Sequence, residues 1–384
     1  MARKICVVIT ARPSYSRIKT ALSAIDRHPD LELQIVVAAS ALLDRYGNPV
    51  HFIEEDGFKV LARVYMVLEG ASPTTMAKTA GLGVMELATV FDNLAPDLVL
   101  TIADRYETLA TAIAASYMNL PVAHVQGGEV TGSIDERVRH AVTKLSDLHF
   151  VSTGAARDRV IRMGEQPDAV FVTGCPSIDL AADVRRDPAL DFDPFEKYGG
   201  VGPAVDLSNG YIVVMQHPVT TEYTMAREHV METLWAVRDL GLPALWFWPN
   251  VDAGSDGTSN GIRSFREIER PTNLHFFKNM NPRDFLKLLC NARCLVGNSS
   301  VGIREGAYLG VPVVNIGSRQ CGRDRGANVL DAPYCQGAIG AAIRAQIAHG
   351  PLPSDPLYGN GDAGERIADL LGRVPFGVEK RLTY

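Results

Sequence analysis

The sequence has few cysteines and no long apolar run. Its six cysteines are scattered and form no C-x-x-C pair, so a zinc site or a redox motif has little support. No stretch approaches the roughly 18 uninterrupted apolar residues of a membrane span, and the apolar run at 5–9 is too short for a signal-peptide core. We therefore expect reduced, buried thiols and a cytoplasmic protein without a membrane partner.

The chain also lacks the basic excess that is typical of nucleic-acid-binding proteins. Its 384 residues include 38 basic and 44 acidic side chains, a net charge of −6, so we expect no nucleic-acid partner. This balance still allows a local basic pocket for a small phosphorylated ligand. At about 150 residues per domain, the length predicts two domains.

Short β-branched apolar runs alternate with amphipathic segments of helix length, the pattern of a parallel sheet covered by helices. Strands are expected at 4–10, 32–39, 98–103, 121–126, 148–152, 169–173, 211–215, 244–248, 274–277, 294–296 and 311–316. Helices are expected at 16–27, 106–118, 135–146, 222–240, 282–290, 302–309, 336–349 and 363–373. The sequence thus predicts an α/β protein with two Rossmann-like domains that face each other across a cleft.

A stretch rich in Pro, Gly and Asp at 186–209 has the composition of a linker. We predict an N-terminal domain at 1–185 and a C-terminal domain at 210–365 on either side of it. The end of the chain, 366–384, is expected to form a C-terminal helix that packs back on the N-terminal domain.

Polar side chains directly follow the predicted strands. Ligands of open α/β sheets bind beyond the carboxyl ends of the strands, so these side chains are candidates to line one cleft. They are Arg12, Asp104, Arg105, Gln126, Glu129, His217, Asn250, Asp252, Ser299, Ser300 and Arg319. Loops are polar in most proteins, but loop polarity alone would not place Asp, His and Arg immediately after apolar runs.

Four candidate residues, three of them in this list, have structural explanations beside functional ones. Ser299 and Ser300 stand at a helix start, where they either bind an anion or simply cap the helix. Asp135 lies one helical turn before Arg139, so it is a candidate for proton transfer or another capping residue. His217 is either structural or a proton donor to a leaving phosphate oxygen.

Together the motifs resemble the hydrolysing UDP-N-acetylglucosamine 2-epimerases, including bacterial sialic-acid enzymes and the epimerase half of the bifunctional animal enzyme. The matching stretches are ARPSYSRI, ADRYETLATA, HVQGGEVTGSIDERVRHAVTKLSDLHF, QHPVTTE, WFWPNVDAGS and GNSSVGIREGAYLGVPVVNIGSRQCGRDRGANVL. The resemblance implies a glycosyltransferase-B-like fold and a homo-dimer or homo-tetramer in sialic acid or nonulosonate biosynthesis. It also implies elimination of UDP from the UDP-sugar and addition of water, giving N-acetylmannosamine without cofactor or metal.

The resemblance also assigns roles. Asp104, Asp135, His217 and Arg139 match catalytic positions, and Gln126 stands where the family commonly has a catalytic glutamate. An amide cannot take or give a proton at neutral pH, so the sugar half of the site is altered. The substrate- and nucleotide-binding positions are Arg12, Ser16, Arg17, Arg105, Asn250, Asp252, Ser299, Ser300, Glu305 and Arg319.

Several functions stay open on these grounds. The first is a hydrolysing 2-epimerase of UDP-N-acetylglucosamine or a related UDP-HexNAc. Gln126 also allows a different NDP-sugar, or a nucleotide-sugar sensor without catalysis. A glycosyltransferase of the same architecture has only fold analogy in its favour. A nucleotide sugar is the expected partner in each case.

Overall fold

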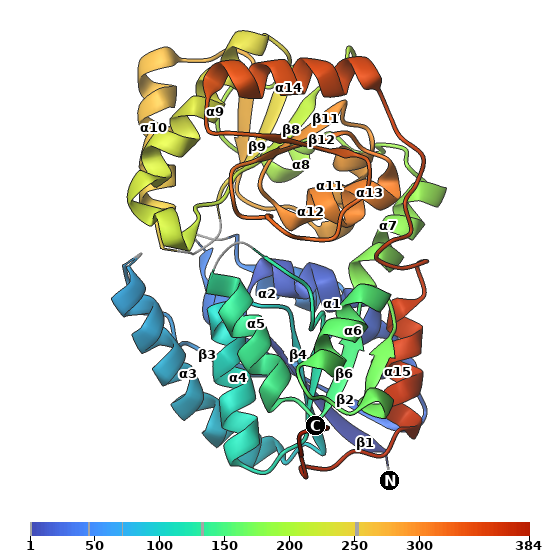
Figure 1. Ribbon diagram of the computed structural model, residues 1–384. Helices are drawn as coiled ribbons and strands as arrows, with labels where there is room; N and C mark the ends of the chain where they lie inside the picture. Colours follow the sequence, from blue (N-terminus) through green and yellow to red (C-terminus); the bar gives the residue numbers. More distant parts are fainter. Residues whose placement is uncertain (1, 45–46, 71, 132–133, 250–252) are drawn as a thin grey trace.

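Two parallel β-sheets, one from each half of the chain, organise the fold. The computed structural model describes every residue except 1, 45–46, 71, 132–133 and 250–252. Within the described residues the first sheet has the strand order β3-β2-β1-β4-β5-β6-β7 and the second β10-β9-β8-β11-β12-β13. Figure 1 shows the two units stacked on each other, with helices beside each sheet. The predicted α/β class with two Rossmann-like domains is confirmed.

The strands are short and mostly buried. They are β1 (Arg3–Ile9), β2 (Leu31–Ala38), β3 (Val60–Val64), β4 (Leu98–Ile102), β5 (Val122–Val125), β6 (Leu148–Val151), β7 (Val170–Val172), β8 (Ile212–Met215), β9 (Ala244–Phe247), β10 (Leu274–Phe277), β11 (Cys294–Gly297), β12 (Val313–Ile316) and β13 (Val329–Ala332).

The first-half helices are α1 (Arg12–Arg27), α2 (Pro49–Glu55), α3 (Pro73–Leu94), α4 (Tyr106–Tyr117), α5 (Ile134–Leu145), α6 (Gly154–Arg162), α7 (Pro176–Arg186) and α8 (Pro194–Tyr198). The others are α9 (Ala226–Leu240), α10 (Ser255–Glu269), α11 (Pro282–Cys290), α12 (Ser300–Ile303), α13 (Glu305–Leu309), α14 (Gln336–His349) and α15 (Ala363–Arg373).

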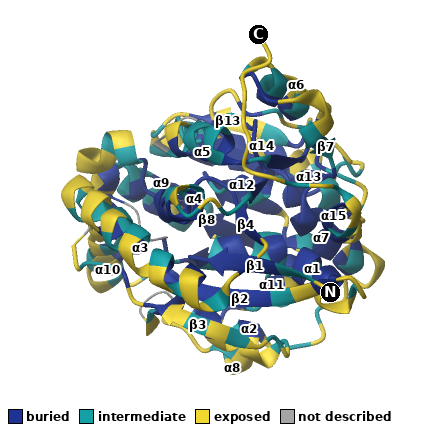
Figure 2. Ribbon diagram, turned by 90° about the horizontal axis from the view of Figure 1, so that it is seen from below, coloured by how far each residue is buried: buried dark blue, intermediate teal, exposed yellow. Residues whose placement is uncertain are grey.

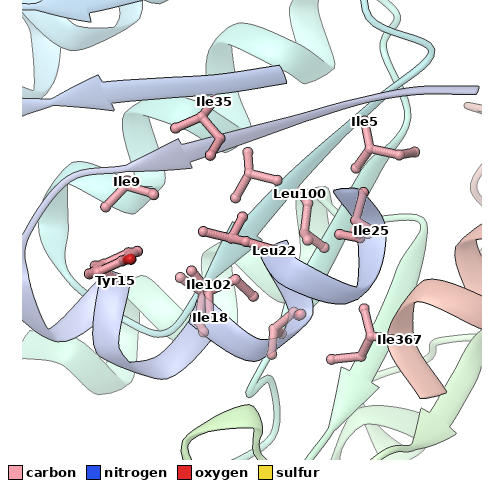
Figure 3. Packing of buried hydrophobic residues seen from close by; sticks show 14 of the residues in the cluster. Ile5, Ile9, Tyr15, Ile18, Leu22, Ile25, Ile35, Leu100, Ile102 and Ile367 are labelled. Atoms are coloured by element: carbon pink, nitrogen blue, oxygen red, sulfur yellow. The ribbon is translucent and has the colours of Figure 1, made fainter. Parts of the chain in front are cut away.

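Side chains on opposite faces of β1 supply two cores. Ile5, Val7 and Ile9 pack against α1, where Ile18 and Leu22 are fully buried (Figure 3). The alternate β1 residues join a second cluster beneath α3 and α4. In Figure 2 the sheet interior is dark blue, whereas yellow lies mainly on the outer helices and loops. A parallel sheet covered on both faces must have such continuous apolar strands.

Where the elements differ from those predicted, the cause is local. The edge strand β3 is half exposed, and α3 contains glycines that obscure its helical pattern; one of them, Gly83, lies against Met66 and Ala110. The helix expected at 302–309 is divided into α12 and α13 at Arg304 (φ −99°, ψ −76°). The helix expected at 222–240 begins only at Ala226, after a 3₁₀ turn.

The segment 186–209, expected as a linker, is folded onto the second domain. It contains α8, and Val201 exchanges backbone hydrogen bonds of 2.9 Å with Phe276 of β10. The ring of Phe195 lies 4.8 Å from that of His275, edge to face. This segment therefore adds apolar cover to the second sheet.

All six cysteines lie in the described part of the chain and are free. Cys6, Cys175 and Cys294 are buried, but Cys321 and Cys335 are exposed. The expectation of buried thiols is therefore wrong for these two, because one lies in a loop and the other at the start of α14. Among the described residues, no helix combines the length and apolarity that crossing a bilayer requires.

The last helix, α15, lies against α1 of the first domain. Ile367 and Leu371 of α15 are fully buried in the same cluster as Ile18 and Leu22. At Gly364 the helices touch so closely that a Cβ atom would lie 2.7 Å from the carbonyl carbon of Thr20. The first domain thus includes the end of the chain in its core.

We expect Gly364→Ala to destabilise the protein by about 1–3 kcal/mol, because the added methyl meets α1 backbone that cannot move aside easily. Gly337→Ala is the matched control: it occupies the same position of α14, with nothing within 4 Å of its Cβ. That change should stabilise the protein by up to about 1 kcal/mol. Urea unfolding followed by circular dichroism measures both, and equal effects would contradict the close contact.

Beyond α15, the chain tail is tied to the first domain by a buried carboxylate. Glu165 accepts hydrogen bonds from Lys144 (2.6 Å) and His149 (3.1 Å), and Lys380 of the tail lies 2.5 Å away. Burial alone raises the pKa of Glu165, but its bonds from His149, Lys144 and Lys380 outweigh burial and lower the pKa to about 2. Lys380 also donates to the carbonyls of Thr143 and Ser146 at the end of α5.

Because the folded-state pKa of Glu165 is depressed, its stabilisation is present above the ordinary value of 4.5 and is lost as pH falls towards 2. We expect wild type to be more stable than Glu165→Gln at pH 7, with the difference shrinking steadily below pH 4.5. Urea unfolding between pH 3 and 7 checks this. Glu379→Gln, an exposed change in the same tail, should show no such trend; a constant Glu165→Gln difference would refute the assignment.

Candidate functional site

A cavity between the two domains opens where the carboxyl ends of both sheets meet. It encloses about 780 Å³, including space open to solvent. Its walls come from the start of α1, from α7 and from the loops after β8, β10 and β11. The lining side chains include Arg12, Ser16, Arg17, Met215, His217, Phe247, Met280, Phe285, Leu286, Ser299, Ser300, Glu305 and Arg319. Strand ends that are distant in sequence therefore do converge on one hollow.

The cavity has an apolar part and a polar part. Met215, Phe247, Met280, Phe285 and Leu286 of the second domain form the apolar part, which suits a flat heterocycle. Arginines, serines and a histidine form the rest. Such a lining fits an elongated ligand with an aromatic group at one end and an anionic group beyond it.

Asp104 lies at the centre of an arginine cluster. It forms an ion pair with Arg139 of α5, and its carboxylate lies 3.8 Å from Arg17 and 4.0 Å from Arg323. Asp104 is 7% exposed and Arg139 only 1%. The Nε and Nη1 atoms of Arg139 are buried without a hydrogen-bond partner. The structure thus brings together the predicted residues Asp104, Arg139 and Arg17, with donors to spare.

A second buried carboxylate joins the two domains. Glu129, after β5, accepts a 2.9 Å hydrogen bond from Arg304 of the second domain and lies 3.4 Å from Arg323. Ser152 completes its shell with a 2.9 Å bond. Burial alone raises the pKa of Glu129, but the charges of Arg304 and Arg323 outweigh burial and hold the pKa below its usual value. Glu129 is therefore an ionised carboxylate buried at the domain interface.

No site role was assigned to Arg304 from the sequence, although it lies in the motif GNSSVGIREGAYLG. It projects from the break between α12 and α13 and donates to Ser300 Oγ at 2.8 Å. Arg17 of the first domain donates to the same hydroxyl at 2.8 Å. The adjacent charged residues Arg304 and Glu305, in a stretch of otherwise mostly small and apolar residues, were the available signal. Ser299 caps α12 through its side chain, so the capping explanation holds for Ser299, while Ser300 joins the arginine cluster.

Gln126 is fully buried and in the left-handed backbone region (φ 69°). Its Nε2 atom donates to Cys175 Sγ at 2.8 Å, and its Oε1 atom accepts from Arg304 at 3.5 Å. The amide is therefore held between a thiol and a guanidinium beside Glu129.

His217 is locked by its backbone. Its N–H donates to Asn298 Oδ1 and its carbonyl accepts from Asn298 Nδ2, both at 2.8 Å. Burial, with Arg319, Arg12 and Arg105 nearby, lowers the pKa of His217 well below its usual value. The ring is therefore neutral at physiological pH.

Asp135 lies in the first turn of α5, and its carboxylate is 3.6 Å from Arg319 of the second domain. The neighbouring Glu136 accepts from the Thr131 backbone at 2.7 Å and pairs with His140 at 2.9 Å. These local contacts belong to Glu136, whereas the contact with Arg319 belongs to Asp135. Arg319 also donates to the Asn298 carbonyl at 3.3 Å.

The remaining predicted residues divide between the cavity and its surroundings. Arg12 donates across the interface to the Lys278 carbonyl at 2.9 Å, and Ser16 and Glu305 line the cavity. Arg105 lies behind, in a buried pair with Glu107 (3.0 Å). Asn250 and Asp252 lie outside the described residues. Among the described residues, no group of three or more His, Cys, Asp or Glu side chains could hold a metal ion.

Cations are crowded around the cavity. Burial and the charge of Arg105 lower the pKa of Arg12 to about 10, and burial and Arg304 lower that of Arg17 to about 9. An anion bound among these side chains would relieve their mutual repulsion. The polar part of the cavity is therefore suited to a phosphate-bearing group.

Comparison with known proteins places these features in a family. Residues 23–372 match the family model for UDP-N-acetylglucosamine 2-epimerases. The chain is 33% identical to a hydrolysing UDP-N,N'-diacetylbacillosamine 2-epimerase of Legionella pneumophila, over 98% of this chain and 97% of the relative. It is 28% identical to a UDP-N-acetylglucosamine 2-epimerase of Neisseria meningitidis, over 97% and 95%.

The fold also matches solved structures. A crystal structure of UDP-GlcNAc 2-epimerase from Neisseria meningitidis bound to UDP-GlcNAc superposes with a TM-score of 0.78 at 16% identity, covering 96% of this chain and 99% of that one. This likeness concerns the fold, and the predicted glycosyltransferase-B-like arrangement is confirmed. The resemblance drawn from the sequence motifs is confirmed as well.

We expect Glu129→Gln to destabilise the protein by about 3–5 kcal/mol, because Arg304 and Arg323 would remain buried without their nearest counter-charge. The control is Asp324→Asn, which removes a half-exposed interdomain pair with Arg159 (2.8 Å) and should cost about 1 kcal/mol or less. Urea unfolding measures both. A Glu129→Gln effect as small as the control would contradict the assignment of Glu129 as a buried anion.

Proposed function

The chain belongs to the UDP-N-acetylglucosamine 2-epimerase family, and on that premise we propose that it is a hydrolysing 2-epimerase of a UDP-linked 2-acetamido sugar. It would release UDP and the free sugar inverted at C2, a N-acetylmannosamine-type product. The observation that carries the proposal is that two arginines of the cavity lining each lie beside a carboxylate of the first domain: Arg17 is 3.8 Å from Asp104 and Arg319 is 3.6 Å from Asp135.

In the proposed reaction, a carboxylate removes the C2 proton as the bond from C1 to the diphosphate oxygen breaks. Asp104, whose carboxylate faces Arg139, Arg17 and Arg323, is the group we assign as base. Water then adds to C1 of the resulting glycal while C2 takes a proton on the opposite face. We assign that second proton transfer to Asp135, because two carboxylates in different surroundings can divide acid and base work.

The leaving diphosphate would lie among Arg12, Arg17, Ser300 and Arg319, whose donors stabilise the charge that develops on it. The neutral ring of His217 can donate a hydrogen bond there without adding another cation. The apolar part of the cavity would take the base of the nucleotide, with Glu305 available to a ribose hydroxyl. We propose no cofactor and no metal for these steps.

The names of two relatives suggest two candidate sugars for the substrate. A relative at 33% identity is a UDP-N,N'-diacetylbacillosamine epimerase and one at 28% a UDP-N-acetylglucosamine epimerase. Both substrates carry the 2-acetamido group. Gln126 is fully buried with its amide held by Cys175 and Arg304 and cannot transfer a proton, so it leaves the proton transfers to the aspartates. We further propose a cytoplasmic homo-dimer or homo-tetramer in sialic acid or nonulosonate biosynthesis.

The test is incubation in deuterated water with UDP-N-acetylglucosamine, UDP-N,N'-diacetylbacillosamine and their GDP counterparts. We expect release of UDP with an equal amount of free 2-epimeric sugar, deuterated at C2. A product still joined to UDP would indicate a non-hydrolysing epimerase. Release only with an acceptor would indicate a glycosyltransferase, and tight binding without turnover a sensor.

We expect Asp104→Asn to lower kcat by about 10²–10⁴-fold, because the amide cannot accept the C2 proton. UDP affinity should change much less, because the apolar part of the cavity belongs to the second domain. The control is Asp324→Asn, which lies in an interdomain ion pair outside the cavity lining and should retain kcat. Initial-rate kinetics of UDP release decide; an active Asp104→Asn enzyme would remove Asp104 from the base role.

A further inference from the structure

Two adjacent strands of the first sheet end in unusual backbone. Ala103, directly before Asp104, has φ 68°, and Gln126, directly after β5, has φ 69°. Left-handed backbone is costly for residues other than glycine and persists only where surrounding contacts hold it. Both positions adjoin the residues that matter most in the proposed site. Contacts from the surrounding structure must therefore hold both positions.

One imidazole, that of His124 on β5, contacts both loops. Its Nε2 atom lies 2.9 Å from the carbonyl oxygen of Ala103, and its Nδ1 atom lies 3.3 Å from Thr143 Oγ1 on α5. A carbonyl can only accept, so Nε2 carries the proton and Nδ1 accepts from the Thr143 hydroxyl. This pattern ties the Ala103 carbonyl to the helix that carries Asp135 and Arg139.

The same ring packs against the loop after β5. A Cβ atom at Gly127 would lie 3.1 Å from His124 Nδ1 and 3.1 Å from Thr143 Oγ1. A side chain at this position would therefore push the ring or the hydroxyl aside. The imidazole beneath Gly127 thus explains why this position has no side chain. The spacing H-x-x-G in HVQGG places the glycine directly over the ring of His124.

The surroundings keep the ring neutral. His124 is fully buried, and burial lowers its pKa to about 4 although the Ala103 carbonyl opposes that shift. The titratable groups that act on it are His149 on β6, Glu129 after β5 and Lys380 of the tail. A neutral ring with one fixed tautomer keeps Nε2 as a donor and Nδ1 as an acceptor. It therefore holds the Ala103 carbonyl and the Thr143 hydroxyl at a fixed separation.

We propose that His124 is a positioning residue for catalysis: it holds the Ala103 carbonyl and underlies Gly127, and so sets the Asp104 and Gln126 loops relative to each other without touching substrate. This inference rests on the proposed function for its kinetic consequence. Its geometric content, that one ring maintains the left-handed Ala103 and the Asp104–Arg139 pair, does not depend on turnover.

The kinetic test compares His124→Phe, which keeps the ring shape without hydrogen bonds, with His124→Gln, which can still donate to Ala103. We expect His124→Phe to lower kcat about 10- to 100-fold, as misplacement of a catalytic group does, with KM and UDP affinity nearly unchanged. His124→Gln should recover most of the loss. A rise in KM with kcat unchanged would overturn the inference. An equal loss of kcat in both variants would overturn it as well.

The matched control is His149→Phe. His149 is the β6 neighbour of His124 in the sheet register and is equally buried, but it bonds to Glu165 instead of a catalytic loop. The His149→Phe change should lower the melting temperature. Its kcat, calculated per molecule able to bind UDP, should stay within about twofold of wild type. If His149→Phe lowered kcat as His124→Phe does, the effect would be general loosening of the sheet and the inference would fail.

Two further measurements need no turnover. Nitrogen-15 NMR of labelled histidine should show His124 neutral and protonated at Nε2 at pH 7. A crystal structure of His124→Phe should show Ala103 outside the left-handed region and the Asp104–Arg139 pair broken. An Nδ1–H tautomer, or an unchanged loop in the variant, would overturn the inference even if wild type is an epimerase; absence of turnover with unchanged wild-type geometry would defeat only the proposed function.

Discussion

Buried negative charge is the constraint on which this architecture depends. Asp104 and Glu129 of the first domain lie almost out of contact with water, where an unpaired carboxylate is prohibitively costly. Their counter-charges come partly from the other domain, through Arg304 and Arg323. Neither domain alone supplies all the positive charges around these carboxylates. The relative placement of the domains is therefore needed to neutralise them. Other arginines, Arg12, Arg17 and Arg319, supply the positive lining of the cavity.

Buried ion pairs at the interface make the arrangement of the domains specific, although burying the charges costs free energy. A buried ion pair contributes little net stability compared with an apolar contact, yet it penalises every arrangement in which the charges are separated. Arg12, Arg17 and Arg319 add further contacts that cross the interface. The cavity is thus formed by residues that also determine how the domains meet, and this explains why binding residues and interface residues are hard to separate here.

Much of this arrangement was predictable from the sequence, since alternating strands and helices and the polar residues at strand ends obey simple periodic rules. Asp104, Asp135 and His217 were identified because they directly follow strands or begin a helix. Arg304 was missed because its role depends on a break between two helices and on Glu129 in another domain, neither of which leaves a periodic signal. The helix α3 was missed because its glycines obscure the helical pattern; one of them, Gly83, packs against Ala110 of α4. Sequence periodicity does not show which residue far along the chain a side chain will contact.

The position of α15 has a consequence for biosynthesis of the protein. Because Ile367 and Leu371 complete the core beneath α1, the first half of the chain lacks part of its interior while the second half is still being translated. At about 5–20 residues per second, the ribosome needs on the order of ten seconds or more to pass from α7 to α15. During that interval the face of α1 that will receive α15 is uncovered, so the nascent chain is exposed to chaperones or to misassociation until the last helix emerges.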